Sequence, residues 1–358
     1  MRVIIAGGGT GGHVYPGIAI AKGILRQHSE AVVLFVGTQR GLESRVVPKE
    51  GFQLATITVS GVKGIHGLKL LTSLFRIPLS LWESYRIVTQ FKPQVVIGVG
   101  GYSSGPPVLI AGLLGIPILL QEQNATPGLT NRLLARLASR VATSFPESQI
   151  FFGKKAVLTG NPVRSEFGRL AKNNSEERFV IFIVGGSQGA RAINQAVIGS
   201  LEYLQGLFAR LIFIHQTGEP DFDEVSRAYG RFEVTHDVRP FFYDMPAQFA
   251  RSDLVISRAG ATTLAEITIA GKPSILIPFP KATDNHQQKN AESLVRAGAA
   301  EIILQNVLSG ELLARRIEFY LDHPESIHQM AKNSKRIGVP DATDRVVSLV
   351  EELALINQ

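Results

Sequence analysis

The sequence predicts an α/β protein built from two domains, each organised around a parallel sheet. Short apolar runs rich in Val, Ile and Phe alternate along the chain with helical patterns, which is typical of parallel α/β layers. A glycine-rich turn follows an apolar run in each half, at residues 7–12 and 185–190. The length of 358 residues exceeds what one hydrophobic core usually organises, so two domains of roughly 100–200 residues each are expected.

The first half reads as strands separated by helices. The β-rich runs predict strands at residues 3–6, 32–36, 54–58, 95–98, 116–121 and 141–143. Helical stretches are predicted to begin near Tyr15, Leu68, Gly105 and Gly128. Because helical patterns separate the runs, the strands are expected to lie parallel.

The second half repeats this pattern, with strands predicted at residues 179–184, 211–215, 232–235, 254–257, 274–277 and 301–304. Turn formers at Thr159–Arg164 predict the boundary, giving domains at residues 1–161 and 162–339. A second crossing is expected near Gly338–Pro340. The last helix then packs back on the first domain, so that residues 340–358 belong to it.

Both glycine-rich turns are suited to binding a phosphate. Neighbouring glycines let backbone N–H groups approach an anion, and the helix that follows points its positive end at the same spot. Gly7, Gly9 and Gly12 also fit the GxGxxG spacing of a dinucleotide fold. Such a fold needs an acid at the end of its second strand, and Glu43 comes too late to serve. A nicotinamide or flavin enzyme is therefore disfavoured, while a glycine turn without a ligand stays the plain alternative.

The amino-acid composition limits the classes of molecule that the protein is expected to bind. The net charge of +7 favours phosphates, anionic lipids or nucleic acid, but the basic residues are scattered and form no recognition module, so nucleic acid is the least favoured. The absence of cysteine excludes disulfides, zinc-finger clusters and a thiol nucleophile, and it fits a reducing compartment. No signal-peptide core and no apolar run of about 20 residues is present. A cytoplasmic protein, soluble or peripheral to a membrane, is expected.

Seven motifs, in order along nearly the whole chain, carry a resemblance to a known family. They are GGGTGGHVYPG (7–17), GVGGYSSGP (98–106), QEQNATPG (121–128), GNPVR (160–164), GGSQGAR (185–191), SRAGATTLAE (257–266) and DNHQQKNA (284–291). The chain resembles the bacterial peptidoglycan glycosyltransferases of family 28. These enzymes add N-acetylglucosamine to the undecaprenyl-diphosphate-linked muramyl-pentapeptide (lipid I) and give lipid II.

The resemblance implies a GT-B fold, in which two Rossmann-like domains face a deep cleft. The N-terminal domain would bind the acceptor and the membrane, and the C-terminal domain would bind UDP-N-acetylglucosamine (UDP-GlcNAc). An inverting transfer without metal or cofactor is implied, as part of cell wall biogenesis, cell shape and cell division. The implied location is the cytoplasmic face of the inner membrane, on an anionic surface, where other cell-wall synthesis proteins are further partners. The sequence agrees with a reaction without metal, because no Asp-x-Asp pair, which would hold the diphosphate through a divalent cation, follows a predicted strand. Arg164 and a helix N-terminus can supply the positive charge for the diphosphate instead.

Three residues of the second domain match donor-binding positions of the family. Ser187 lies where the second glycine turn meets its helix and would bind a phosphate oxygen, unless it is only an N-cap. Glu266, early in a helix, would accept both ribose hydroxyls, and its alternative is an exposed surface carboxylate. Gln287 would read the sugar hydroxyls, because an amide both donates and accepts, or it is only a polar helix start.

Further donor contacts come from the Phe242 loop and the first domain. Phe242 is expected beside the uracil, with its backbone rather than its ring reading the base; many relatives have an aliphatic residue there. Arg164 would reach the diphosphate, unless it is a solvated surface charge, and Asn124 would orient a sugar. Thr10, Gly11 and Gly12, at the mouth of the first domain, are also assigned to the donor.

The acceptor side is predicted at two glycine-rich loops of the first domain. A lipid diphosphate needs many N–H donors and no bulky side chains, which both loops provide. The residues assigned to the acceptor are Gly9, His13, Tyr102, Ser103 and Ser104. Among the nearby candidates, only His13 has a side chain of a type whose ordinary pKa, roughly 6.5, lies close to the working pH. His13 is therefore predicted as the general base. The alternative is a helix-capping imidazole that orients the loop.

The segment at residues 65–82 bears on the membrane. It mixes large apolar side chains with basic residues, and Pro78 is expected to prevent one smooth membrane-spanning helix. An apolar patch with a basic rim, including Lys69 and Arg86, would dock on anionic lipid. An ordinary core-facing helix is the alternative.

Other functions are compatible with the same architecture. UDP-N-acetylglucosamine 2-epimerases share the two domains and the donor, but they do not need the acceptor motifs. A noncatalytic membrane scaffold would retain nucleotide binding alone. A glycosyltransferase acting on another lipid, such as diacylglycerol, is the nearest enzymatic alternative.

Overall fold

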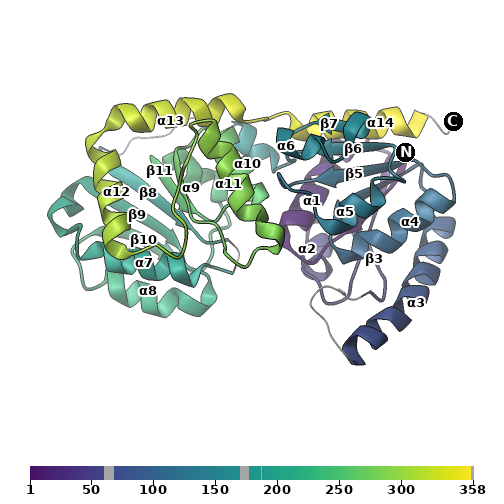
Figure 1. Ribbon diagram of the computed structural model, residues 1–358, viewed down its shortest axis with the longest axis horizontal. Coiled ribbons are helices and arrows are strands. Elements are labelled where there is room, and N and C mark those ends of the chain that lie inside the picture. Colours follow the sequence, from purple (N-terminus) through teal and green to yellow (C-terminus); the bar gives the residue numbers. More distant parts are fainter. Residues whose placement is uncertain (60–67, 170–176, 187, 356–358) are drawn as a thin grey trace. The chain divides into compact units, whose positions relative to one another are not determined.

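The computed structural model describes residues 1–59, 68–169, 177–186 and 188–355, with only the backbone course at 68–76 (Figure 1). It divides into two compact units, Met1–Arg164 with Asp341–Gln358, and Ser165–Pro340. The predicted first boundary, after residue 161, lies three residues before the end of the first segment at Arg164. The predicted second boundary, after residue 339, lies one residue before the end of the second unit at Pro340.

The first unit contains a parallel sheet of seven strands in the order β3-β2-β1-β4-β5-β6-β7. The strands are β1 (Arg2–Gly7), β2 (Val32–Gly37), β3 (Gln53–Thr56), β4 (Val95–Gly100), β5 (Ile118–Glu122), β6 (Arg140–Thr143) and β7 (Ala156–Leu158). Val3, Ile4 and Ile5 of the central strand are fully buried. Helices cover both faces of such a sheet, which explains why its central strands are continuous apolar runs.

Two hydrophobic cores lie on the two faces of this sheet. The helices of the unit are α1 (Gly11–Gln27), α2 (Glu43–Lys49), α3 (Leu68–Phe91), α4 (Gly105–Leu113), α5 (Leu129–Leu134), α6 (Pro146–Gln149) and α14 (Ala342–Leu355), with 3-10 turns η1 (Tyr102–Ser104) and η2 (Gly153–Lys155). The C-terminal helix α14 packs on α1, and its Val346, Val350 and Leu353 are buried in the core that contains Ile5. Ion pairs from His28 and Arg140 to Glu351 and Glu352 lie at its surface.

The helix α3 includes Pro78 within its 24 residues, so the proline does not end the helix. Proline removes one backbone donor, but tertiary packing supplies most of a helix's stability. Beyond the proline, Ser84 and Val88 are buried, and Val88 belongs to a hydrophobic core. Across the described ranges no helix is long and apolar enough to cross a bilayer.

The second unit contains a parallel sheet of six strands in the order β10-β9-β8-β11-β12-β13. Its strands are β8 (Phe179–Val184), β9 (Leu211–Gln216), β10 (Thr235–Arg239), β11 (Leu254–Ser257), β12 (Ser274–Leu276) and β13 (Glu301–Ile302). Its helices are α7 (Arg191–Leu201), α8 (Phe222–Tyr229), α9 (Met245–Arg251), α10 (Ala261–Ala270), α11 (His286–Arg296), α12 (Gly310–Asp322) and α13 (Pro324–Ile337), with turns η3 (Ser165–Arg169), η4 (Gln205–Arg210), η5 (Glu219–Asp221) and η6 (Thr283–Asn285). A core that includes Ile181, Ile183 and Phe213 fills it.

The sequence misplaced or missed several elements, among them the short helix α6. The strand predicted at residues 232–235 is wrong, because β10 occupies Thr235–Arg239. This strand and the unpredicted β7 lie at sheet edges, where one neighbouring strand and little burial leave a weak apolar pattern. The short helix α2 was also not predicted.

In each sheet the glycine-rich turn follows a central strand, β1 or β8. The neighbours of β1 are β2 on one side and β4 on the other, and β8 lies likewise between β9 and β11. These are the switch points at which open α/β sheets bind ligands, outside the carboxyl ends of the strands. The topology therefore places both predicted phosphate turns at binding positions.

Candidate active site

The first glycine turn presents His13 in a defined tautomer. The His13 Nδ1 lies 3.1 Å from the Gly8 carbonyl oxygen and 3.4 Å from Thr10 Oγ1. Because a carbonyl only accepts, Nδ1 carries a hydrogen, and in the neutral ring the lone pair is then on Nε2. Gly9 adopts the left-handed region, with φ at 87°, and is exposed together with Thr10. His13 therefore has the protonation pattern of a general base at Nε2.

The loop after β4 packs directly on this turn. A Cβ on Gly100 would lie 2.9 Å from His13 Cδ2, and one on Gly101 would lie 2.6 Å from the Gly8 carbonyl oxygen. Tyr102 is exposed, whereas Ser103 and Ser104 are buried. The Ser104 hydroxyl donates to the Gly101 carbonyl at 2.8 Å, which supports the turn itself. The two predicted acceptor loops are therefore in contact, and in the loop after β4 it is Tyr102 that reaches solvent.

Glu122, which the sequence reasoning did not select, organises the loop that carries Asn124. Its buried carboxylate accepts from the backbone N–H groups of Asn124 (2.9 Å) and Gly128 (3.1 Å) and from Asn131 Nδ2 (2.9 Å). Burial raises the pKa of Glu122, and these hydrogen bonds act in the opposite direction. Asn124 is half-buried at the start of this loop.

The second glycine turn packs on the loop after β9. A Cβ on Gly189 would lie 1.9 Å from the Thr217 carbonyl oxygen, and one on Gly218 would lie 2.5 Å from that of Gln188. Both glycines have positive φ, so two turns of backbone meet without side chains between them. Ser187, predicted to bind phosphate, lies outside the described residues.

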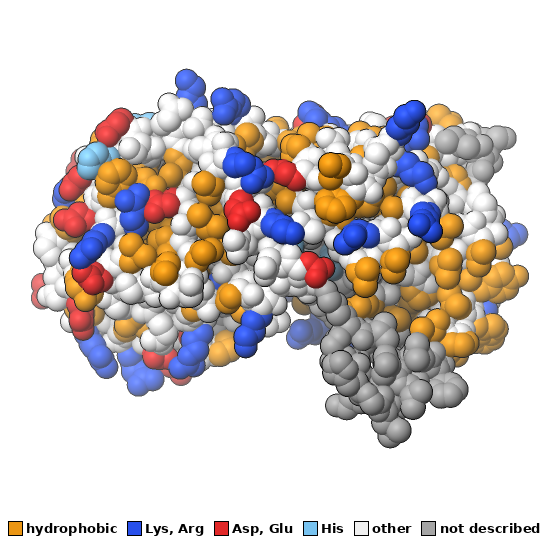
Figure 2. All heavy atoms as spheres, viewed as in Figure 1, with side chains coloured by type: hydrophobic (Ala, Val, Ile, Leu, Met, Phe, Trp, Pro, Cys, Tyr) orange, Lys and Arg blue, Asp and Glu red, His pale blue; other side chains and the backbone are white. Residues whose placement is uncertain are grey.

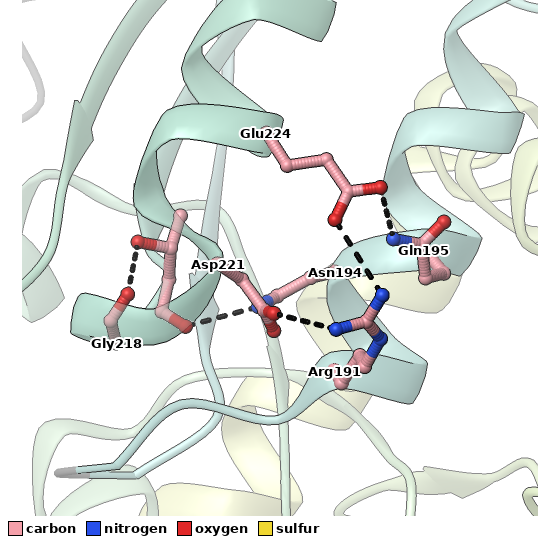
Figure 3. A network of polar contacts seen from close by, with 7 residues as sticks. Arg191, Asn194, Gln195, Gly218, Asp221 and Glu224 are labelled. Carbon is pink, nitrogen blue, oxygen red and sulfur yellow. Dashed lines mark hydrogen bonds and ion pairs between the residues drawn. The ribbon is translucent and has the colours of Figure 1, made fainter.

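A polar network joins the start of α7 to the loop after β9 and to α8 (Figure 3). Its Asn194 and Asp221 are buried, whereas Arg191 is exposed. Asn194 Nδ2 donates to the Thr217 carbonyl (2.9 Å) and to Asp221 Oδ2 (2.8 Å). Its Oδ1 remains to accept from His215 Nε2 at 3.0 Å. Arg191, at the start of α7, lies 3.6 Å from Asp221 Oδ1. The network fixes the first turn of α7 against the loop after β9.

Gln216 joins the second glycine turn to the loop of Phe242. Its Nε2 donates to the Gly186 carbonyl at 3.1 Å, and its Oε1 accepts from the Phe242 N–H at 2.9 Å. The amide is buried. The backbone of Phe242 is predicted to read uracil, and its N–H group is engaged by Gln216. The Phe242 ring is buried against Phe182, with their centroids 6.1 Å apart.

Two further donor candidates lie on α10 and α11, the α-helices that follow β11 and β12. Glu266 is buried in α10, and Gln287 is half-buried in the first turn of α11. Gln287 Oε1 accepts from the Phe279 N–H at 2.9 Å. Asp284 and Asn285, just before α11, adopt left-handed backbone conformations, which non-glycine residues rarely hold outside functional loops.

Arg164 is half-buried and is the last residue of the first segment of its unit. Among the residues with described positions, no three His, Asp or Glu side chains are grouped as ligands for a metal ion. The metal-independent reaction that the resemblance implies stays a prediction.

Comparison with known families gives two matches in tandem. The description "Glycosyltransferase family 28 N-terminal domain" matches residues 3–143, and "Glycosyltransferase family 28 C-terminal domain" matches residues 180–346. Together they cover most of the chain. The chain belongs to glycosyltransferase family 28.

Relatives of this family-28 glycosyltransferase carry one name. It is 48% identical, over 99% of its length and 93% of the relative's, to "UDP-N-acetylglucosamine--N-acetylmuramyl-(pentapeptide) pyrophosphoryl-undecaprenol N-acetylglucosamine transferase" of Myxococcus xanthus. A protein of the same name from Thermodesulfovibrio yellowstonii is 45% identical, with 99% of both chains covered. The family resemblance predicted from the seven motifs is therefore confirmed.

Solved structures agree with this family-28 assignment. The crystal structure of Acinetobacter baumannii MurG matches with a TM-score of 0.81 at 32% identity, covering 98% of this chain and 99% of that one. A UDP-GlcNAc 2-epimerase from Neisseria meningitidis matches with a TM-score of 0.68 at 15% identity, which shows a shared fold alone. The predicted class, two Rossmann-like α/β domains of the GT-B kind, is confirmed.

Proposed function

We propose that this enzyme transfers N-acetylglucosamine from UDP-GlcNAc to undecaprenyl-diphosphate-linked N-acetylmuramoyl-pentapeptide, giving lipid II for peptidoglycan synthesis. The observation that carries the proposal is 45–48% identity, over nearly the full length, to transferases named for this reaction. The 2-epimerase alternative is not supported, since its likeness is limited to the fold.

The proposed transfer reaction gives a role to residues of both units. His13 Nε2 takes the proton of the acceptor hydroxyl while its oxygen forms a bond to the anomeric carbon of the donor. The bond from that carbon to the diphosphate oxygen breaks, and UDP leaves with the electron pair. Backbone donors of the second glycine turn and the Arg164 guanidinium would stabilise the developing charge. Glu266 and Gln287 would hold the ribose and the sugar.

A transfer assay tests the reaction directly. Purified protein is mixed with radiolabelled UDP-GlcNAc and a short-chain muramyl-pentapeptide diphospholipid in EDTA, and label is followed into the lipid. Label in the lipid supports donor, acceptor and metal independence together. Binding of UDP-GlcNAc without transfer would contradict this acceptor, and release of epimerised sugar without acceptor would support the epimerase reaction.

Donor binding gives a first prediction through Gln216. In Gln216→Glu a carboxylate oxygen replaces the Nε2 that donates to the Gly186 carbonyl, so two acceptors face each other in a buried site. We expect the Kd for UDP, measured by calorimetry, to rise about tenfold or more, because a lost buried hydrogen bond costs roughly 1–3 kcal/mol. The same substitution at exposed Gln205 should leave the Kd within about twofold. Equal Kd values for both variants would contradict the role.

An exposed apolar surface of the first unit supports peripheral attachment to a membrane (Figure 2). We call it the apolar patch; its exposed members are Ile77, Leu79, Trp82, Tyr85, Leu113, Leu114, Leu129, Leu133, Leu137, Ile150 and Phe151. The helices α3, α4 and α5, which carry most of them, pack one against the next. Arg86 lies over the Trp82 ring and Arg132 over the Phe151 ring, so cations border the apolar side chains. Such a surface fits insertion into anionic lipid, at the cytoplasmic face of the inner membrane where the acceptor lies.

Flotation with anionic liposomes tests the apolar patch. Trp82 is 54% and Leu133 67% exposed, so an aspartate at either position should not disturb the core. We expect Trp82→Asp and Leu133→Asp each to lower the bound fraction at physiological salt about tenfold, because burying such a side chain contributes roughly 1.5–3 kcal/mol. Tyr203→Asp, at an exposed aromatic residue of the second unit, is the matched control. Unchanged flotation of both patch variants would refute the membrane proposal.

A further inference from the structure

Glu43 is a buried carboxylate that the proposed reaction does not use directly. It is 1% exposed and lies at the start of α2, in the loop region after β2. Its Oε1 accepts from the Thr38 N–H at 2.9 Å and from Thr38 Oγ1 at 2.8 Å. Its Oε2 accepts from the Gly9 N–H at 2.8 Å. A carboxylate buried at this depth requires such partners, so the geometry around it is tightly specified.

Three glycines make room for this carboxylate. A Cβ on Gly8, Gly37 or Gly41 would lie 2.3, 2.5 or 2.1 Å from an atom of the Glu43 side chain. These glycines come from the first glycine turn, from the end of β2 and from the loop before α2. Part of the glycine content at this site therefore accommodates Glu43 rather than a ligand.

The peptide between Gly8 and Gly9 connects Glu43 to His13. Its N–H, on Gly9, donates to Glu43 Oε2, and its carbonyl, on Gly8, accepts from His13 Nδ1 at 3.1 Å. The Gly8–Gly9 peptide bond is trans, like every other peptide bond among the described residues, so its N–H and carbonyl groups point in opposite directions from one rigid plane. Fixing the N–H thus fixes the carbonyl that orients the imidazole, and hydrogen bonds in such a chain polarise one another.

We propose that Glu43 is a positioning residue for the general base, acting on His13 through the Gly8–Gly9 peptide. The carboxylate holds the peptide plane, the peptide holds Nδ1–H, and Nε2 is thereby presented to the acceptor hydroxyl. The arrangement resembles a carboxylate–histidine pair with one peptide group inserted between them. It rests on the proposed role of His13 as the base.

Glu43→Gln tests this because an amide keeps one acceptor oxygen and replaces the other with a donor. Either Gly9 or Thr38 then loses its acceptor. We expect kcat for transfer to fall on the order of 10- to 100-fold, since a small misplacement of a reacting group has effects of that size. The KM for UDP-GlcNAc should stay within about twofold. Glu50→Gln, in a surface ion pair with Lys22, is the matched control and should retain kcat.

A double-variant cycle separates positioning from an independent role. In the His13→Ala background, Glu43→Gln should lower kcat by less than about twofold, because its target is gone. Independent losses that multiply in the double variant would overturn the proposal. If His13→Ala alone retains kcat, the assignment of the base fails instead.

Nitrogen-15 spectra of the histidines give a readout that does not depend on activity. His13 is assigned by its loss in His13→Ala, and in the wild type its neutral form should carry the hydrogen on Nδ1. Glu43→Gln should shift the tautomer toward Nε2–H, and an unchanged signature would overturn the proposal. Should Glu43→Gln fail to fold, Gly41→Ala provides a second variant, because its Cβ displaces the carboxylate from the loop before α2. The same loss of kcat and the same spectral change are expected from it.

Discussion

Replacing His13 by alanine is expected to lower kcat for sugar transfer by about 10²- to 10⁴-fold, the range typical of a lost general base. A sugar hydroxyl attacks poorly until its proton is accepted, and a neutral His13 ring that donates from Nδ1 to the Gly8 carbonyl carries its basic lone pair on Nε2. The KM for UDP-GlcNAc should change little. Initial rates at saturating donor and acceptor measure the effect, and His28→Ala at the other end of α1 is the control.

A second variant separates the base from its alternative, an imidazole that only orients the turn. In His13→Asn the amide nitrogen can take the place of Nδ1 and donate to the Gly8 carbonyl, but the side chain cannot accept a proton at pH 7. The base assignment predicts that both variants are equally impaired. Recovery of kcat in His13→Asn would favour the orienting role, and undiminished kcat in a folded His13→Ala protein would refute the base.

Acid is expected to destabilise the second unit through His215. Burial lowers the pKa of this histidine from 6.5 to about 3. Its Nε2–H donates to Asn194 Oδ1, and its Nδ1 faces the Tyr229 hydroxyl at 3.3 Å, so the folded site holds the neutral ring. Below pH 6.5 the His215 imidazole binds a proton in the unfolded chain but stays neutral in the folded chain. The stabilisation is therefore complete above pH 6.5 and is lost as the pH falls toward 3.

The loss should approach about 1.4 kcal/mol for each pH unit below 6.5, or on the order of 3 kcal/mol at pH 4. Urea unfolding followed by circular dichroism, from pH 4 to 7.5, measures it against His215→Gln, whose side chain does not titrate. The difference in free energy of unfolding between the two proteins should change with pH. Parallel curves would contradict the prediction. The single tryptophan, Trp82, belongs to the first unit, so its fluorescence follows that unit separately.

The sequence predicted the parts of the fold that depend on local pattern. Strands such as β1 and β8 are continuous apolar runs buried on both faces, and a glycine-rich turn follows each of them. The family motifs likewise required no knowledge of distant contacts, whereas the order of the strands in each sheet was not predicted. The edge strand β10 was misplaced because its residues, THDVR, are stabilised by pairing with β9 rather than by an apolar pattern.

The supporting residues of the candidate site could not be predicted in this way. Glu43 contacts Gly9 from 34 positions away, and Gln216 joins residues 30 positions before it and 26 after it. Single-sequence patterns carry no signal at such separations. In the sequence, Glu43 was considered only as an acidic residue that comes too late in the chain to bind a ribose. The glycines that enclose it were interpreted as phosphate-binding residues. The partner of the Phe242 N–H could not be predicted either, because Gln216 lies at the end of β9, 26 residues earlier in the chain.

The return of α14 to the first unit also bears on how the protein is made. The first unit needs Val346, Val350 and Leu353 to complete its core, but residues 165–340, which form the second unit, are synthesised before them. At roughly 5–20 residues per second, a ribosome needs about 10–35 s to make those 176 residues. During that time the second unit can finish folding while the nascent first unit still exposes an apolar groove beside α1. Chaperones that bind exposed apolar surface would therefore meet the N-terminal half of this protein, although it leaves the ribosome first.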